Sequence, residues 1–124
     1  MKDEFMNMEN DIDERTFAFA VRIFKLCQSL EKGTNSSRVL ADQLLRSGTS
    51  IGANAQEARA AQSKADFIAK MSISRKESRE TLYWLKLLAA TKLVPATLLT
   101  DITDEADQLV AILTAIVKTA QSNK

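Results

Sequence analysis

Apolar residues recur every three or four positions along most of this chain, the spacing that places side chains on one face of an α-helix. The pattern predicts four helices, at about residues 11–32, 37–61, 64–92 and 96–121. Asp11 or Asp13 can cap the first of them. Residues 1–10 show no usable periodicity and are predicted to form a flexible, acidic N-terminal tail.

Residues suited to helix ends lie between these segments. Gly33 is expected just beyond the first helix in the left-handed conformation. Residues 35–37 (Asn-Ser-Ser) offer caps for the second helix, Ser63 offers one for the third, and Pro95 suits the first turn of the fourth. Because long helices are joined by short loops, residues 11–121 are predicted to form an all-α, antiparallel up-down-up-down four-helix bundle.

Two features predict an interface beyond this bundle. The first helix carries two apolar stripes, one of Phe17, Ala20, Val21, Phe24 and Cys27 and the other of Phe19, Ile23, Leu26 and Leu30. One stripe is enough for a monomeric bundle. In the second helix, Gly48 and Gly52 lie on one face, although a helical glycine costs roughly 1 kcal/mol relative to alanine. Their missing side chains let another helix approach closely or make room for a large residue such as Trp84. We therefore expect a homo-oligomer.

A polar stripe is predicted on the third helix, where Glu77 and Glu80 stand between Ile73 and Trp84. A buried carboxylate needs a partner. The second helix offers Asn54 and Glu57 to complete a polar layer, bridged by Ser50, Arg46 or Arg59. The alternative is that both glutamates are solvated.

Several classes of chemistry lack their residues. The chain contains no histidine, so a ferritin-like metal centre and a histidine-assisted nucleophile are both excluded. It has no glycine-rich phosphate loop, and Cys27 on an apolar face is expected to fill the core. No apolar run is long enough to span a bilayer, and the acidic start is unlike a signal peptide. We expect a cytoplasmic, non-enzymatic protein without a cofactor, a metal or a small-molecule substrate.

Charge is unevenly distributed along the chain. Residues 38–92 carry ten basic and five acidic side chains, whereas the segments on either side carry a net negative charge. A basic middle segment suggests an anionic partner, but a solvated helix surface explains it equally well. The candidate phosphate contacts are Arg59, Lys64, Lys70, Arg75, Lys76 and Arg79. The near-neutral total charge of +1 is unlike that of a dedicated nucleic-acid binder.

The segment RSGTSIGANAQEARAAQSKADFIAKMSISRKESRETLYWLKLL resembles the four-helix bundle proteins encoded in intervening sequences of bacterial 23S rRNA genes. The residues that carry the resemblance are Ser50, Gly52, Ala53, Asn54 and Glu57, then Ser63, Asp66 and Phe67, then Glu77, Glu80, Thr81, Trp84 and Leu85. The chain departs from the family at Ala55, where a larger aliphatic residue is common. SISRKES also replaces a small, apolar segment of the family.

This resemblance implies a homopentamer with a central channel. It also implies kinship with the accessory protein of diversity-generating retroelements, a basic pentameric bundle that binds nucleic acid and a reverse transcriptase. The resulting hypothesis is a non-enzymatic, oligomeric bundle that binds RNA, other nucleic acid or a nucleoprotein partner. The alternative is a purely structural scaffold whose partner is another protein. A likeness of fold is a weak argument for function.

Overall fold

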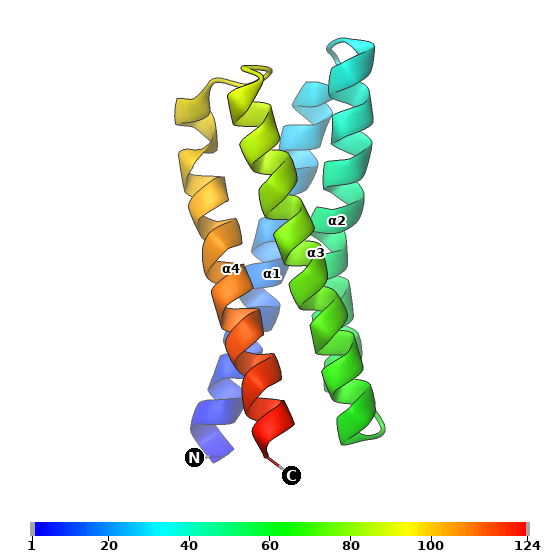
Figure 1. The fold of residues 1–124 in the computed structure, drawn as a ribbon, viewed down its shortest axis with the longest axis vertical. Coiled ribbons are helices and arrows are strands. Elements are labelled where there is room, and N and C mark those ends of the chain that lie inside the picture. Colours follow the sequence, from blue (N-terminus) through cyan, green and yellow to red (C-terminus); the bar gives the residue numbers. More distant parts are fainter. Residues whose placement is uncertain (1, 124) are drawn as a thin grey trace.

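A computed structural model describes residues 2–123, with side chains from residue 11 onwards. Within that part of the chain it contains four helices and no strand (Figure 1). The helices are α1 (Lys2–Leu30), α2 (Asn35–Arg59), α3 (Lys64–Ala90) and α4 (Ala96–Ser122). The predicted all-α bundle is confirmed, and three of the four helices lie within two residues of their predicted bounds at either end.

The start of α1 was predicted wrongly. The helix begins at Lys2, so residues 2–10 continue it and do not form a separate tail. No glycine or proline interrupts this segment, so its backbone can continue the helix. These backbone preferences outweigh the missing apolar periodicity on which the prediction rested.

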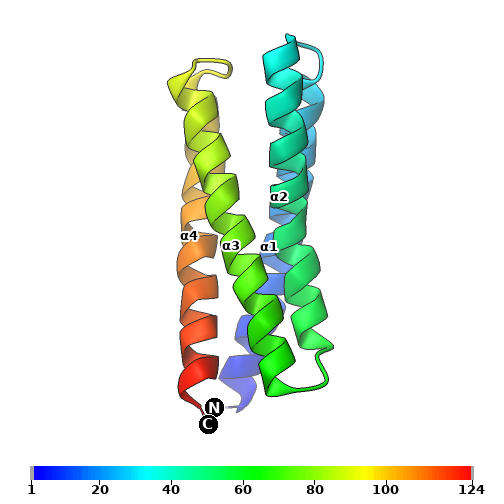
Figure 2. The same cartoon turned by 45° about the vertical axis from the view of Figure 1, so that its right-hand side comes forward.

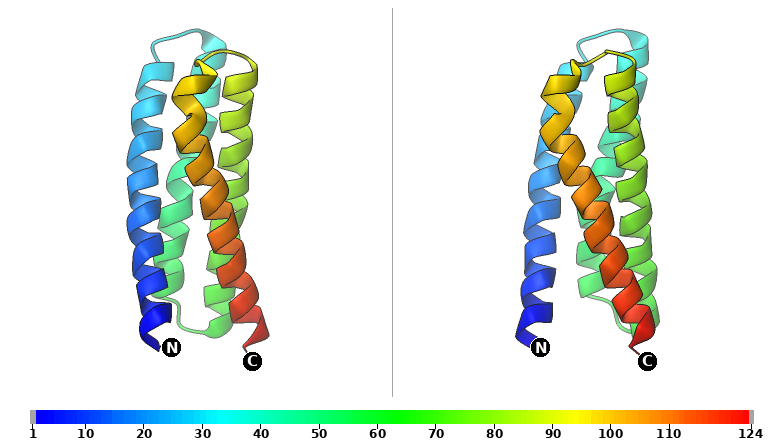
Figure 3. Two further views of the ribbon diagram at one scale, coloured as in Figure 1. Left: turned by 90° about the vertical axis from the view of Figure 1, so that its left-hand side faces the viewer. Right: turned by 60° about the vertical axis from the view of Figure 1, so that its left-hand side comes forward.

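Consecutive helices run antiparallel, so α1 begins and α4 ends at the same end of the bundle (Figures 1 and 2). α2 packs against both α1 and α3, and α3 packs against α4. The pair α1 and α4 packs most loosely, and the two helices diverge towards the chain termini (Figure 3). None of the helices within residues 2–123 is both long and apolar enough to cross a membrane.

The helix ends are fixed by side chains that the sequence identified only in part. Ser63 accepts a hydrogen bond from the Asp66 N–H at 3.0 Å, as predicted. The cap of α2 is Thr34, whose side chain accepts from the Ser37 N–H at 3.3 Å, so the cap precedes residues 35–37. Pro95 precedes the first turn of α4 as its capping residue.

Gly33 does not adopt the predicted left-handed conformation. The buried Ser37 hydroxyl donates to the carbonyl of Leu30 at the end of α1. A Cβ on Gly33 would lie 2.6 Å from Ser37 Oγ. Gly33 therefore makes space for a side-chain hydrogen bond. The left-handed residue is Lys92, after α3, with φ of 61°.

The core takes one of the two predicted stripes of α1. Phe19, Ile23 and Leu30 are buried, together with Cys27 from the other stripe. The hydrophobic core is completed from the other helices by Ala41, Leu44, Ile51, Ala55, Ala58, Met71, Leu85, Leu88, Leu99, Ile102, Ala106, Leu109, Leu113, Ile116 and Val117. Phe17 and Phe24 remain 67% and 50% exposed. Phe17, Val21 and Phe24, from the stripe that contains Phe17, thus form an uncovered apolar surface of the single chain.

Candidate nucleic-acid interface

The outer face of α3 carries a row of cations. Its inner face is buried through Met71, Ser74, Glu77, Ser78, Thr81, Leu85 and Leu88. Residues three or four apart share a helical face, so Lys76, Arg79, Tyr83 and Lys86 follow one another along the side away from that core. Arg75 is half-buried beside them, and the other four are exposed. We call Arg75, Lys76, Arg79, Tyr83 and Lys86 the α3 stripe.

The cations of the α3 stripe are not neutralised by neighbouring acids. Within the part of the chain that has described side chains, Arg75, Lys76, Arg79 and Lys86 form no ion pair. The exposed carboxylates of α4, at Asp101, Asp104 and Asp107, likewise form none with α3. Among the described side chains, the four cations of the stripe are therefore not engaged in ion pairs.

Glu77 and Glu80 of α3 form ion pairs with a residue of α2. Arg46 of α2 bridges them, with Nη1 3.3 Å from Glu77 Oε2 and Nη2 hydrogen-bonded to Glu80 Oε1. Glu77 is 8% exposed, so this bridge compensates a carboxylate that is nearly removed from water. The predicted bridge between these glutamates and an arginine of α2 is present.

The rest of the predicted polar layer has a different composition. The Asn54 amide donates to the Ser50 carbonyl of its own helix at 2.9 Å, and Glu57 is exposed. Small hydroxyl groups fill the contact between α2 and α3. Ser74 donates to the Ile51 carbonyl at 2.7 Å, and Thr81 donates to Ser47 at 2.9 Å. Asn54 and Glu57 were therefore assigned wrongly to the layer.

The six predicted phosphate contacts do not form a single surface. Arg59 lies at the end of α2, where its Nη1 is 2.5 Å from Asp13 Oδ2 of α1. Lys64 is exposed at the first residue of α3. Lys70 is half-buried in a helical column with Ser74 and Glu77, which face α2. Only Arg75, Lys76 and Arg79 are brought together on the outer face.

Sequence reasoning missed two members of the stripe, Tyr83 and Lys86. Their signal was the spacing, because Arg79, Tyr83 and Lys86 continue the same helical face. Tyr83 is 60% exposed, and its ring meets that of Trp84 edge-on, with centroids 5.2 Å apart and an interplanar angle of 75°. Trp84 is partly buried against the core, as is the family-motif residue Phe67.

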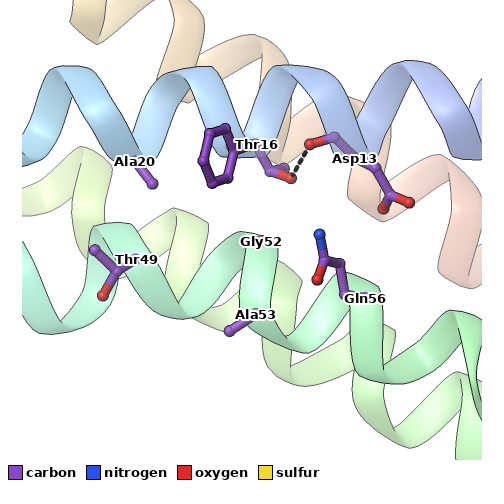
Figure 4. Close-up of a pocket in the computed structure, with 8 residues that line it drawn as sticks. Asp13, Thr16, Ala20, Thr49, Gly52, Ala53 and Gln56 are labelled. Carbon is purple, nitrogen blue, oxygen red and sulfur yellow. Dashed lines mark hydrogen bonds between the residues drawn. The ribbon is translucent and has the colours of Figure 1, made fainter.

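A second surface lies between α1 and α2. Figure 4 shows a hollow with Thr16 and Ala20 on one side and Thr49, Gly52, Ala53 and Gln56 on the other. Its volume is about 340 Å³, and Asp13 and Phe17 complete its lining. Asp13 is the only charged residue in this lining, so the hollow is largely uncharged.

The glycines of α2 shape this surface from within. The atoms nearest to a Cβ placed on Gly48 belong to Ile23, and those nearest to one on Gly52 belong to Thr16. The predicted close helix approach is thus made by α1 of the same chain, and Trp84 is not among the nearest neighbours of either glycine. These glycines need no second subunit to explain them.

No group of three or more His, Cys, Asp or Glu side chains in the described part of the chain is placed to hold a metal ion. Burial raises the pKa of the Cys27 thiol to about 11, and its Sγ donates to the Ala41 carbonyl at 3.3 Å. A protonated, buried thiol is a poor nucleophile. Cys27 thus packs as a core residue.

Comparison with known proteins identifies the family of the chain and a solved structure that is similar to it. The chain matches the 23S rRNA-intervening sequence protein family over residues 8–115. A crystal structure of a protein of unknown function from the S23 ribosomal protein family of Bacteroides thetaiotaomicron is 41% identical in sequence. The match covers 90% of this chain and 98% of that one, with a TM-score of 0.82. No curated protein matches at a significant level.

Proposed function

Because the chain belongs to the family of 23S rRNA-intervening sequence proteins, we propose that it is a non-enzymatic, oligomeric helical bundle that binds RNA. The observation that carries this proposal is the α3 stripe. Four cations stand on one helical face without an ion pair among the described side chains, while Glu77 and Glu80 are engaged by Arg46. The buried, protonated Cys27 suits the reducing cytoplasm in which RNA is found.

The physical argument concerns local field rather than total charge. A subunit of net charge +1 attracts a polyanion weakly at long range. Arginine and lysine side chains within about one Debye length, ~8–10 Å in physiological salt, act on the same phosphates. Arg75, Lys76 and Arg79 lie within about one helical turn and so meet this condition. Phosphate contacts of this kind bind RNA without reading its sequence.

Oligomerisation would make such weak contacts effective. Phe17 of α1 lines the hollow against α2, and the exposed Val21 and Phe24 follow it at helical spacing. An exposed apolar face of this kind favours association. We propose that this face is covered by neighbouring subunits in a ring, for which the family resemblance implies a pentamer. Each copy of the α3 stripe would then add its contacts to the same RNA, which raises the overall affinity by avidity.

Binding of a fluorescently labelled RNA by the purified protein at ~50 mM salt, followed by anisotropy, tests the proposal, because phosphate contacts are strongest at low salt. Replacing Lys76→Glu and Arg79→Glu together should weaken binding at least ~10-fold, about 1.4 kcal/mol. The matched control is Lys25→Glu with Lys118→Glu, which makes the same charge change at exposed positions of α1 and α4. Equal losses in both variants would show a general charge effect. If the wild-type protein does not bind, the RNA proposal fails, and the protein-interaction scaffold takes its place.

A further inference from the structure

We propose that Tyr83 is a stacking platform for an unpaired base, and that the α3 stripe therefore selects single-stranded RNA over duplex RNA. This inference rests on the proposed RNA-binding function and gives it a substrate class. The observation behind it is that the exposed ring of Tyr83 lies between the cations of the α3 stripe. Single exposed apolar side chains are common on protein surfaces, so the surroundings of Tyr83 are what matter.

Tyr83 lies where a nucleotide held by the stripe would place its base. Arg79 stands four residues before it, Lys86 three residues after it and Lys76 seven residues before it, so all three lie on its helical face. The ring is 60% exposed, and among the described residues none forms a hydrogen bond with the Tyr83 side chain. Cations that grip phosphates, combined with an aromatic face that accepts a base, form the usual surface for single-stranded nucleic acid.

The neighbouring indole supports the ring. Trp84 packs against the hydrophobic core and meets Tyr83 edge-on, with centroids 5.2 Å apart. An aromatic pair in this geometry is attractive. A ring held by a core residue loses less conformational entropy when a base stacks on it, which makes stacking more favourable than on a free side chain. Tyr83 is thus partly oriented before RNA arrives.

Duplex RNA presents few unpaired bases to Tyr83. Its bases are paired and stacked inside the helix, so an aromatic side chain can reach them only at ends, loops or bulges. A duplex can still use the phosphate contacts of Lys76 and Arg79. The stripe should therefore bind both forms, with the additional stacking contact available only to the single strand.

The test compares a labelled, unstructured RNA strand with a length-matched RNA duplex at one salt concentration, using wild-type protein and two variants. We expect the wild type to prefer the single strand. Tyr83→Ala should lower single-strand affinity ~10-fold or more and leave duplex affinity within ~2-fold, since stacking is sequence-tolerant but requires an open base. Tyr83→Phe keeps the ring and should retain the wild-type preference. A DNA strand of the same sequence is expected to bind equally or more weakly.

Trp84 gives an independent readout, because it is the only tryptophan in the chain. A base stacked on Tyr83 comes close to the indole, so single-stranded RNA should quench tryptophan emission in the wild type and in Tyr83→Phe. The duplex should quench it much less. An unchanged far-UV circular dichroism spectrum of the free Tyr83→Ala protein, with a cooperative thermal transition, would show that its fold is intact.

The outcomes separate this inference from the proposed function. If the single strand and the duplex bind equally and Tyr83→Ala weakens neither, the stacking platform is wrong although the protein binds RNA. If neither RNA binds, the proposed function and the inference both fail. Tighter binding of the DNA strand than of the RNA strand would overturn the assignment to RNA.

Discussion

Gly48 lies so close to Ile23 that a Cβ on the glycine would be 2.8 Å from Ile23 Cγ2 and 3.0 Å from its Cγ1. Real Cβ atoms essentially never approach a neighbour to 2.8 Å. Ile23 is fully buried and β-branched, so its side chain has little freedom to turn aside. The absence of a side chain at Gly48 therefore sets how closely α1 and α2 can pack.

This contact predicts that Gly48→Ala destabilises the bundle although alanine is the better helix former. Overpacking a filled core costs typically 1–3 kcal/mol, whereas the gain in helix propensity is below ~1 kcal/mol. We expect a net loss of up to ~2 kcal/mol in the free energy of unfolding, measured by urea titration at a fixed protein concentration. A more stable Gly48→Ala protein would contradict the close contact.

A double-mutant cycle identifies the neighbour. Ile23→Val shortens the side chain that the new methyl group meets, and its own cost is ~0.5–1.5 kcal/mol. If the two residues clash as described, the double variant should be more stable than the sum of the single effects predicts. Gly52→Ala serves as the comparison, because its Cβ would lie 3.0 Å from Thr16 Oγ1 and should cost less.

The bridge from Arg46 to Glu77 and Glu80 leads to a second prediction. Arg46→Met keeps an unbranched apolar stem but removes the guanidinium group, which leaves the nearly buried Glu77 without its partner. We expect a loss of about 1–3 kcal/mol, smaller than for a fully buried pair because the Arg46 side chain is half exposed. Adding Glu77→Gln should restore part of the stability. No recovery on adding Glu77→Gln would show that Arg46 acts by packing alone.

The buried thiol of Cys27 should lower the free energy of unfolding at alkaline pH. Burial raises the pKa of its thiol to about 11 from the ordinary value of 9.0. In the unfolded chain the thiol ionises first, so the stabilisation is complete below pH 9 and is lost as the pH rises towards 11. Urea titrations across this range should show a steeper fall for wild type than for Cys27→Ala. Parallel curves would show that Cys27 contributes no pH dependence.

If the apolar face of α1 is the subunit interface, one charged substitution on it should dissociate the oligomer. Phe17→Arg places a cation at the hollow between α1 and α2, where association would have to desolvate it. Light scattering should then give a mass near the 13.7 kDa of one chain, while wild type gives several times that mass. Leu98→Arg alters another exposed apolar residue, 72% accessible on α4, and should leave the assembly intact. A monomeric wild type would refute the proposed oligomer.

The helices and their antiparallel order could be predicted because apolar periodicity, caps and short loops are properties of neighbouring residues. Which of the two α1 stripes is buried could not be predicted, because the stripe with Phe17 and the stripe with Phe19 both show helical spacing. Contacts with α2, such as Ile23 against Gly48, decide which stripe is buried. Tertiary packing, and not periodicity, thus determines which α1 stripe is buried.

The candidate site was predicted in part for the same reason. Arg75, Lys76 and Arg79 are close in sequence, so one helix turn brings them together. Arg59 seemed an equivalent cation until the fold placed Asp13 beside it from another helix. Tyr83 was overlooked because an aromatic residue at helical spacing is usually a core residue, and only its exposure in the bundle distinguishes it.

The most direct test of RNA binding through the α3 stripe is the salt dependence of affinity in matched variants. The logarithm of the binding constant should fall steeply with the logarithm of salt concentration in the wild type. Lys76→Glu with Arg79→Glu should flatten the slope by ~0.7 for each lost contact with a single strand, about 1.4 for every subunit engaged. The Lys25→Glu, Lys118→Glu control should keep the wild-type slope. An unchanged slope and affinity in the α3 variant would contradict the proposed interface.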